Sequence, residues 1–315
     1  MAARTLGSPP SILPLYARAA ASLIPGTSLL PFIPGGGKDV PDIELVLAGV
    51  RVDPDKLARY AKVCGYAKVC GFSLRDHLPP AYPHVLAFPL HMAAMADGRF
   101  PFGAVGLVHI ENRIVQHRLI GLGEEMEIRV RATKLQEHPR GLTFALLSEV
   151  RVRGEMVWEG VSRMLRRGGG SGKRSGHAGS EAELEPSEAE LEPTAEWRLG
   201  GDLGRRYAAV SGDRNPIHMH PLLARPLGFS RAIAHGMWTK ARCLAELESR
   251  LPDAFSADVS FRKPILLPAR VVFASAQHGE QIDFSVRDAE RGSTHLEGHT
   301  QPLPAKQASD RRNPT

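Results

Sequence analysis

The chain has 315 residues, of which 43% are hydrophobic and 23% are charged. This composition excludes a mostly disordered protein, and the length is sufficient for two ordinary domains. The formal net charge is +6, but the basic residues are scattered and aromatic residues make up only 6% of the chain. We therefore expect an anionic small molecule or carrier as the partner, and no nucleic acid.

Residues 1–41 are expected to form an N-terminal arm. Prolines and Arg18 interrupt its apolar stretches long before the roughly 18 apolar residues of a membrane-spanning helix accumulate. No cleavage site is evident either. The segment therefore predicts neither a membrane span nor a removable leader.

The three cysteines, Cys64, Cys70 and Cys243, do not have the spacing of a zinc or redox motif. Two of them lie in a tandem copy, because residues 60–65 are repeated as residues 66–71. We expect all three to be structural thiols in a reducing, cytoplasmic protein.

The first predicted elements are a helix over 88–96, beginning near Pro89, and three strands within 126–164. A proline is tolerated in the first turn of a helix. The strand residues alternate or run continuously apolar, with a turn at Gly154 before the third strand, and indicate an antiparallel meander.

Residues 166–196 are expected to be a solvated linker. They contain a Gly/Ser-rich stretch at 168–172, followed by the acidic segment 181–187 and its near copy 188–194. Like charges, glycine and proline all oppose a packed core.

The order of elements then recurs. Helices are predicted over 203–210 and 237–250, and strands over 257–261, 270–276, 281–286 and 295–300. Each half is thus a helix followed by an antiparallel sheet. Because a long apolar helix must bury its face, it is expected to lie on the sheet, which gives an α+β fold.

A dense polar motif lies between the two helices of the second half. It reads Ser-Gly-Asp-x-Asn-Pro-x-His over residues 211–218, and Gly228-Phe229 and Ala234-His235-Gly236 follow it. Glycine ends the first helix and Asn215 caps the next, so Asp213 and His218 are expected on either side of a tight turn. No other aspartate has a histidine five residues later.

This motif resembles the signature of the MaoC-like, type 2 (R)-specific enoyl thioester hydratases and dehydratases. Their fold is the hot-dog, a curved antiparallel sheet wrapped around a central helix. The two halves resemble the double hot-dog members of that family. The resemblance implies an N-terminal half over 42–165 that lacks catalysis, a catalytic half over 197–302, and a disordered tail over 303–315.

The resemblance also implies roles. Asp213 and His218 would hold and activate the water that adds to a trans-2-enoyl thioester or leaves a (3R)-3-hydroxyacyl thioester, as in fatty acid metabolism. Asn215 would orient this pair or the water. The N–H of Gly236, at a helix N-terminus, would stabilise the thioester oxyanion. No metal and no cofactor are implied.

Further residues are expected to shape the site or bind the acyl-CoA or acyl carrier protein substrate. His235 either lines the pocket or satisfies a backbone group. Arg262 or Lys263 either binds the phosphates of coenzyme A or lies at a solvated strand end. The full set of expected binding residues is Ser211, Gly212, Phe229, His235, Arg262 and Lys263.

Alternatives remain at this stage. A metal site could combine Asp213, His218, His220 and His235, although Asn215-Pro216 opposes the strand that such a site needs. Many relatives also carry an acidic residue at the position of His220. A hot-dog thioesterase and a non-catalytic acyl-thioester-binding or assembly subunit are the rival functions. Either a monomer or a homodimer agrees with two halves in one chain.

Overall fold

The computed structural model describes residues 2–66, 76–168 and 191–304, apart from residues 23, 25, 28, 29, 31 and 36. Cys70, most of the expected linker and residues 305–315 of the expected tail lie outside these ranges. In the described ranges, no helix has both the length and the apolarity required to cross a membrane.

The strands form a sheet in the order β1-β2-β4-β6-β7-β3-β9-β12-β11-β10-β8, and β5 pairs with β6 beside this path. All neighbours are antiparallel except β1 and β2. The first-half strands are β1 (Ala2–Leu6), β2 (Ile43–Val50), β3 (Val108–Gln116), β4 (Met126–Ala132), β5 (Gln136–His138), β6 (Gly141–Val152) and β7 (Glu155–Arg167). Those of the second half are β8 (Pro193–Leu199), β9 (Phe255–Phe261), β10 (Ala269–His278), β11 (Gln281–Asp288) and β12 (Thr294–Pro302).

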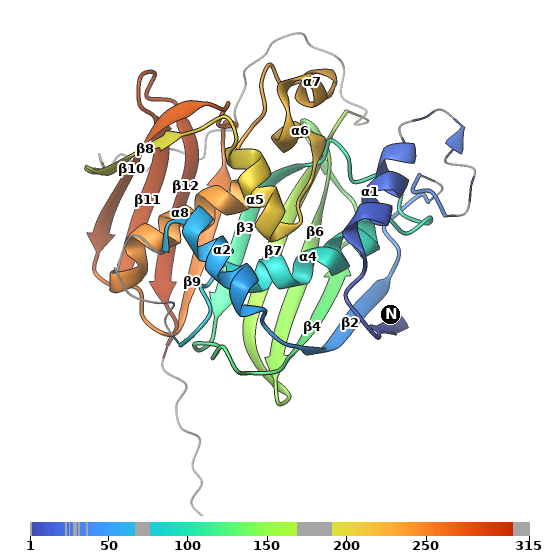
Figure 1. The fold of residues 1–315 in the computed structure, drawn as a ribbon, viewed down its shortest axis with the longest axis horizontal. Coiled ribbons are helices and arrows are strands. Elements are labelled where there is room, and N and C mark those ends of the chain that lie inside the picture. Colours follow the sequence, from blue (N-terminus) through green and yellow to red (C-terminus); the bar gives the residue numbers. More distant parts are fainter. Residues whose placement is uncertain are drawn as a thin grey trace, which may run out of the picture.

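The main helices lie across one face of this sheet (Figure 1). They are α1 (Ile12–Ala21), α2 (Pro54–Cys64), α4 (Tyr82–Met95), α5 (Leu203–Ser211), α6 (Pro216–Met219), α7 (Pro221–Ala224) and α8 (Gly236–Leu247). Apolar side chains of α4 and α8 share one buried core with both parts of the sheet, including Leu90, Leu244, Ile128 and Val271. Each half is therefore a sheet packed on its own central helix, α4 or α8, as the α+β prediction requires.

The two halves join edge to edge. Strands β3 and β9 pair antiparallel, with Ile114 opposite Ala257. Lys240 of α8 is fully buried beneath this junction. Its ammonium donates to Asn112 Oδ1 (2.6 Å), to the Asn112 carbonyl (3.0 Å) and to the Ala257 carbonyl (2.9 Å). These three hydrogen bonds offset the cost of burying the amine and fasten α8 to both halves.

Several predicted boundaries were wrong. Helix α4 begins at Tyr82, not near Pro89, because Pro83 already occupies its first turn and Pro89 is accommodated in its interior. Strand β3 was not predicted, although it forms the junction. Strands β7 and β8 extend into both ends of the expected linker, and β1 and α1 lie within the expected arm.

Cys64 and Cys243 are buried free thiols. Burial raises the pKa of both, so they stay protonated. This agrees with the structural role expected for them.

Candidate active site

The motif forms a tight turn between α5 and α6. Gly212 follows the last residue of α5 with a φ of 81°, a left-handed conformation that glycine adopts without strain. Asn215 caps α6, whose first residue is Pro216; the Asn215 side chain accepts from the Ile217 N–H (3.5 Å). The caps predicted from the sequence therefore fix the positions of Asp213 and His218.

Asp213 is held through one of its two carboxylate oxygens. The Tyr16 hydroxyl donates to Oδ1 at 2.8 Å, and the Asn215 N–H donates to the same oxygen at 3.1 Å. Oδ2 has no hydrogen-bond partner among the described residues, and His235 Nε2 lies 3.8 Å from it. The side chain is 27% exposed. Asp213 thus presents one free oxygen to the pocket.

His218 has a defined tautomer in its neutral form. Its Nδ1 lies 2.8 Å from the Ile233 carbonyl, which can only accept, so the ring proton sits on Nδ1 and Nε2 carries a lone pair. The ring stacks on His235 with centroids 3.6 Å apart. By the same logic His235 Nε2 donates to the Asp213 carbonyl (2.9 Å), which leaves its Nδ1 unprotonated.

Asp213, His218 and His235 each offer one potential ligand atom to the cavity. These three atoms lie within 4.8 Å of one another. Two hydrogen bonds of about 2.8 Å to one water span such a gap. The spacing therefore suits one water molecule held among these three side chains.

Gly236 is the first residue of α8, and His235 is its N-cap. The N–H of a first helical residue has no partner within the helix and lies at the positive end of the helix dipole. A side chain at this position would come within 3.0 Å of the Phe261 ring. A larger residue would therefore have to displace the Phe261 ring slightly, and it would narrow the approach to the N–H.

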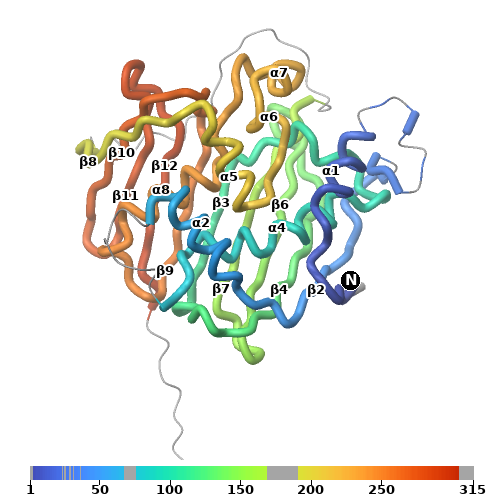
Figure 2. Tube along the Cα trace, in the orientation of Figure 1, coloured from blue at the N-terminus to red at the C-terminus, as the bar shows by residue number. Residues whose placement is uncertain are grey.

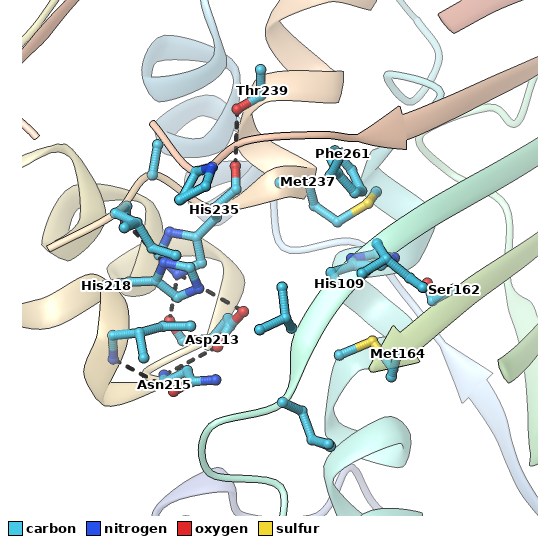
Figure 3. A pocket seen from close by; sticks show the side chains of 18 of the residues that line it. His109, Ser162, Met164, Asp213, Asn215, His218, His235, Met237, Thr239 and Phe261 are labelled. Carbon is cyan, nitrogen blue, oxygen red and sulfur yellow. Dashed lines mark hydrogen bonds and ion pairs between the residues drawn. The ribbon is translucent and has the colours of Figure 1, made fainter. Parts of the chain in front are cut away.

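Asp213, Asn215, His218, His235 and Gly236 line a single cavity that both halves build (Figure 3). Asp213, Asn215 and His218 stand on one side, while His109 of β3 and Ser162 and Met164 of β7 face them across the space. The apolar lining includes Val85, Phe88, Met95, Leu107, Leu146, Leu165, Ile233 and Ile265. The first half therefore contributes a whole wall of the cavity.

The expected binding residues differ in their placement. Ser211, Phe229, His235, Arg262 and Lys263 line the cavity, but Gly212 does not; it lies against the Ile12 side chain. Ser211 also holds the turn, since its hydroxyl donates to the Tyr207 carbonyl (2.9 Å) and accepts from the Asp213 N–H (3.1 Å). His235 both lines the cavity and satisfies a backbone group, so its two proposed roles coexist.

Arg262 and Lys263 form a basic rim of the cavity together with Arg140 and Arg167. The sequence predicted only the first two. Arg140 and Arg167 of the first half line the same cavity and are exposed. Arg262 is paired with Glu297 at 3.0 Å, and Arg167 lies over the Phe229 ring at 5.3 Å. The entrance therefore has positive charge from both halves.

A cluster of three first-half histidines was also missed. His84 and His91 lie on α4 and His109 on β3, and all three line the cavity. The rings of His84 and His91 are 5.1 Å apart, and His91 Nε2 lies 2.7 Å from Ser148 Oγ. The seven-residue spacing of His84 and His91, which puts both on one helix face, was the available signal.

Burial controls the protonation of these groups. Burial lowers the pKa of His84 to about 4 and those of His109 and His235 to about 3. It also lowers the pKa of His218, although Asp213 and the Ile233 carbonyl oppose the shift. For Asp213, burial raises the pKa, but His235, His218 and the hydrogen bonds from Tyr16 and Asn215 outweigh it, so the net shift is downward.

We expect these shifts to make the protein sensitive to acid. The unfolded chain takes up protons on these histidines near pH 6.5, whereas the folded chain resists protonation until about pH 4 at His84. The free energy of unfolding should therefore fall as the pH drops below about 6.5, by about 1.4 kcal/mol per pH unit for each such histidine. Urea unfolding between pH 7.5 and 5 measures how the free energy of unfolding changes with pH. His109→Gln should lower the number of protons taken up on unfolding by about one. A free energy of unfolding that does not change with pH would contradict this prediction.

The same three side chains, Asp213, His218 and His235, have the spacing of a metal site. His220, the fourth residue of the alternative considered above, is not part of this group. It is exposed, and its Nδ1 accepts from the Leu222 N–H (3.2 Å) to cap α7. His218 Nδ1 and His235 Nε2 are each committed to a carbonyl, which leaves one nitrogen per ring.

Fold and site together agree with the class expected from the sequence, a double hot-dog hydratase or dehydratase. The MaoC like domain family matches residues 188–299. The 3-hydroxyacyl-thioester dehydratase X of Mycobacterium tuberculosis (strain ATCC 25618 / H37Rv) is 37% identical over 287 residues, which cover 91% of this chain and 96% of the relative. The chain therefore belongs to the MaoC-like dehydratase family, whose members are hydro-lyases.

Solved structures agree on the fold. That of HtdX from Mycobacterium tuberculosis has a TM-score of 0.71 and 35% identity, and the match covers 82% of this chain and all of that one. A double hot-dog protein of the same organism, RV0216, has a TM-score of 0.50 and 13% identity over 84% of this chain and 96% of its own. The predicted double hot-dog fold is thereby confirmed.

Proposed function

We propose that this protein adds water reversibly to trans-2-enoyl thioesters to give (3R)-3-hydroxyacyl thioesters. The observation that carries the proposal is the grouping of Asp213, His218 and His235 within 4.8 Å of one another, next to the helix N-terminus at Gly236. The name of the Mycobacterium tuberculosis relative, a 3-hydroxyacyl-thioester dehydratase, supports the same reaction.

In the hydration direction, Asp213 orients the water and His218 Nε2 accepts its proton as the oxygen attacks the β-carbon. The C–O bond forms while the electrons of the double bond move toward the thioester carbonyl. The Asp213 carboxylate stabilises the imidazolium that results. The same pair then returns the proton to the α-carbon, so that the elements of one water are added; dehydration runs these steps in reverse.

The enolate oxygen needs a donor while its charge develops. The Gly236 N–H, assisted by the dipole of α8, supplies it. The Thr239 N–H already donates to the His235 carbonyl (3.1 Å), so the helical hydrogen bonds of α8 begin at Thr239. The absence of a side chain at Gly236 leaves room for the thioester.

The basic rim fits the phosphates that both coenzyme A and the phosphopantetheine arm of acyl carrier protein carry. Arg140, Arg167, Arg262 and Lys263 line it. The acyl chain would then extend along the apolar wall built largely by the first half. In this proposal the first half shapes the pocket and the second half carries the catalytic residues.

The direct test is the loss of enoyl-thioester absorbance when purified protein meets trans-2-enoyl-CoA of short, medium and long chain, with the matching carrier-protein thioesters in parallel. Turnover that persists in a chelator supports the metal-free mechanism. Turnover that the chelator abolishes would favour the metal alternative. No turnover on any substrate would favour the non-catalytic binding subunit.

Met164 offers a test of the proposed acyl pocket. It lies on β7, lines the cavity and faces Asp213 (Figure 3). Met164→Phe enlarges the side chain, so kcat/KM for long-chain enoyl-CoA should fall about tenfold relative to short-chain substrate. Met164→Leu, which conserves volume, should keep the wild-type ratio. Unchanged selectivity in both Met164→Phe and Leu165→Phe would undermine the proposal that this wall selects the acyl chain.

A further inference from the structure

Tyr16 lies about two hundred residues before the catalytic motif and yet contacts its aspartate. It belongs to α1, the N-terminal helix, which lies beside α4 (Figure 2). Leu15 and Ala19 of α1 share a buried cluster with side chains of α4. Ile12, one turn earlier on α1, lies against Gly212. The end of the Ile12 side chain thus occupies the space beside Gly212, so α1 packs directly on the turn that carries Asp213.

The direction of the hydrogen bonds at Tyr16 is fixed. The Arg214 N–H donates to the phenol oxygen at 2.9 Å, so the hydroxyl proton is free to go to Asp213 Oδ1, 2.8 Å away. Burial, followed by the neighbouring Asp213 carboxylate, raises the pKa of Tyr16, so the hydroxyl keeps this proton. Tyr16 is therefore a permanent donor to Asp213.

This donor decides which oxygen of Asp213 meets the water. Oδ1 receives hydrogen bonds from Tyr16 and from the Asn215 N–H, while Oδ2 has no hydrogen-bond partner among the described residues. A carboxylate held by one oxygen cannot rotate without losing both bonds. The free oxygen stays near His235, whose Nε2 lies 3.8 Å from it.

We infer that Tyr16 is a positioning residue, which fixes Oδ1 of Asp213 so that Oδ2 alone orients the reacting water. The inference rests on the proposed hydratase function. It assigns a part of the active site to the N-terminal helix, outside both hot-dog halves. Fixing the carboxylate should raise kcat measurably. Misplacement of a catalytic group slows the chemical step more than it weakens substrate binding.

The test is Tyr16→Phe, which removes only the hydroxyl, measured from pH 5 to 9. We expect kcat to fall about tenfold while KM changes less than about twofold. The acid limb of the kcat profile should move to higher pH. Loss of the donor destabilises the Asp213 carboxylate and raises its pKa, and the less neutralised carboxylate also raises the pKa of His218, so both effects have the same sign.

Tyr82→Phe is the matched control, because the Tyr82 hydroxyl is buried and has no hydrogen-bond partner among the described residues. It should leave kcat and the acid limb unchanged. A Tyr16→Phe protein with wild-type kcat and an unshifted acid limb overturns the inference. If the wild type itself shows no turnover, the proposed function fails. If the wild type turns over and Tyr16→Phe turns over equally well, only the inference about Tyr16 fails.

Discussion

Asp213→Asn is expected to lower kcat for enoyl-thioester hydration about 10³-fold. The amide is nearly isosteric, and its oxygen can still accept from Tyr16 and Asn215. What disappears is the negative charge that orients the water and stabilises the His218 imidazolium, and a positioned acid–base group of this kind is worth about 10² to 10⁴ in rate. The absorbance assay over a range of substrate concentrations measures kcat and KM separately.

The fold should survive this change. Thermal unfolding is expected within about 4 °C of wild type, since the hydrogen bonds to Oδ1 remain. Asp202→Asn is the matched control: it makes the same chemical change at the start of α5, away from the cavity lining, and should retain wild-type kcat. An Asp213→Asn protein within threefold of wild-type kcat would refute the assignment of Asp213 to proton chemistry.

His218→Ala is expected to lower kcat about 10²- to 10³-fold, because the unprotonated Nε2 that acts as the base in the proposed mechanism is lost. It should also destabilise the protein. The Ile233 carbonyl loses its donor, and an unsatisfied buried carbonyl costs about 1–3 kcal/mol. Steady-state kinetics and urea unfolding on the same preparation separate the two effects.

Two further measurements decide how His218 acts. Added imidazole should restore part of the activity of His218→Ala if the lost function is proton transfer, because the vacated space borders the cavity. His220→Ala removes a histidine two residues away that is exposed and outside the Asp213–His218–His235 group. It should behave as wild type; a loss comparable to that of His218→Ala would instead support the metal alternative.

The turn that carries Asp213 and His218 was determined by the sequence alone. Gly212 and Asn215 are local signals, since one ends α5 and the other caps α6 within a few residues. These caps fix the short path between Asp213 and His218 whatever surrounds them. The periodicity of the later strands and of α8 was likewise readable, because side chains that alternate in the sequence alternate across a sheet.

Only the tertiary structure decided what surrounds that turn. Tyr16 and Asp213 are 197 residues apart, and no local periodicity encodes a contact between a helix in an expected arm and a distant turn. The wall formed by His109 and Met164 depends on the pairing of β3 with β9, which joins two strands from different halves. Burial, and not residue type, then lowers the pKa of the pocket histidines. Such contacts follow from how the elements pack together, whereas spacing along the chain reports only which elements form.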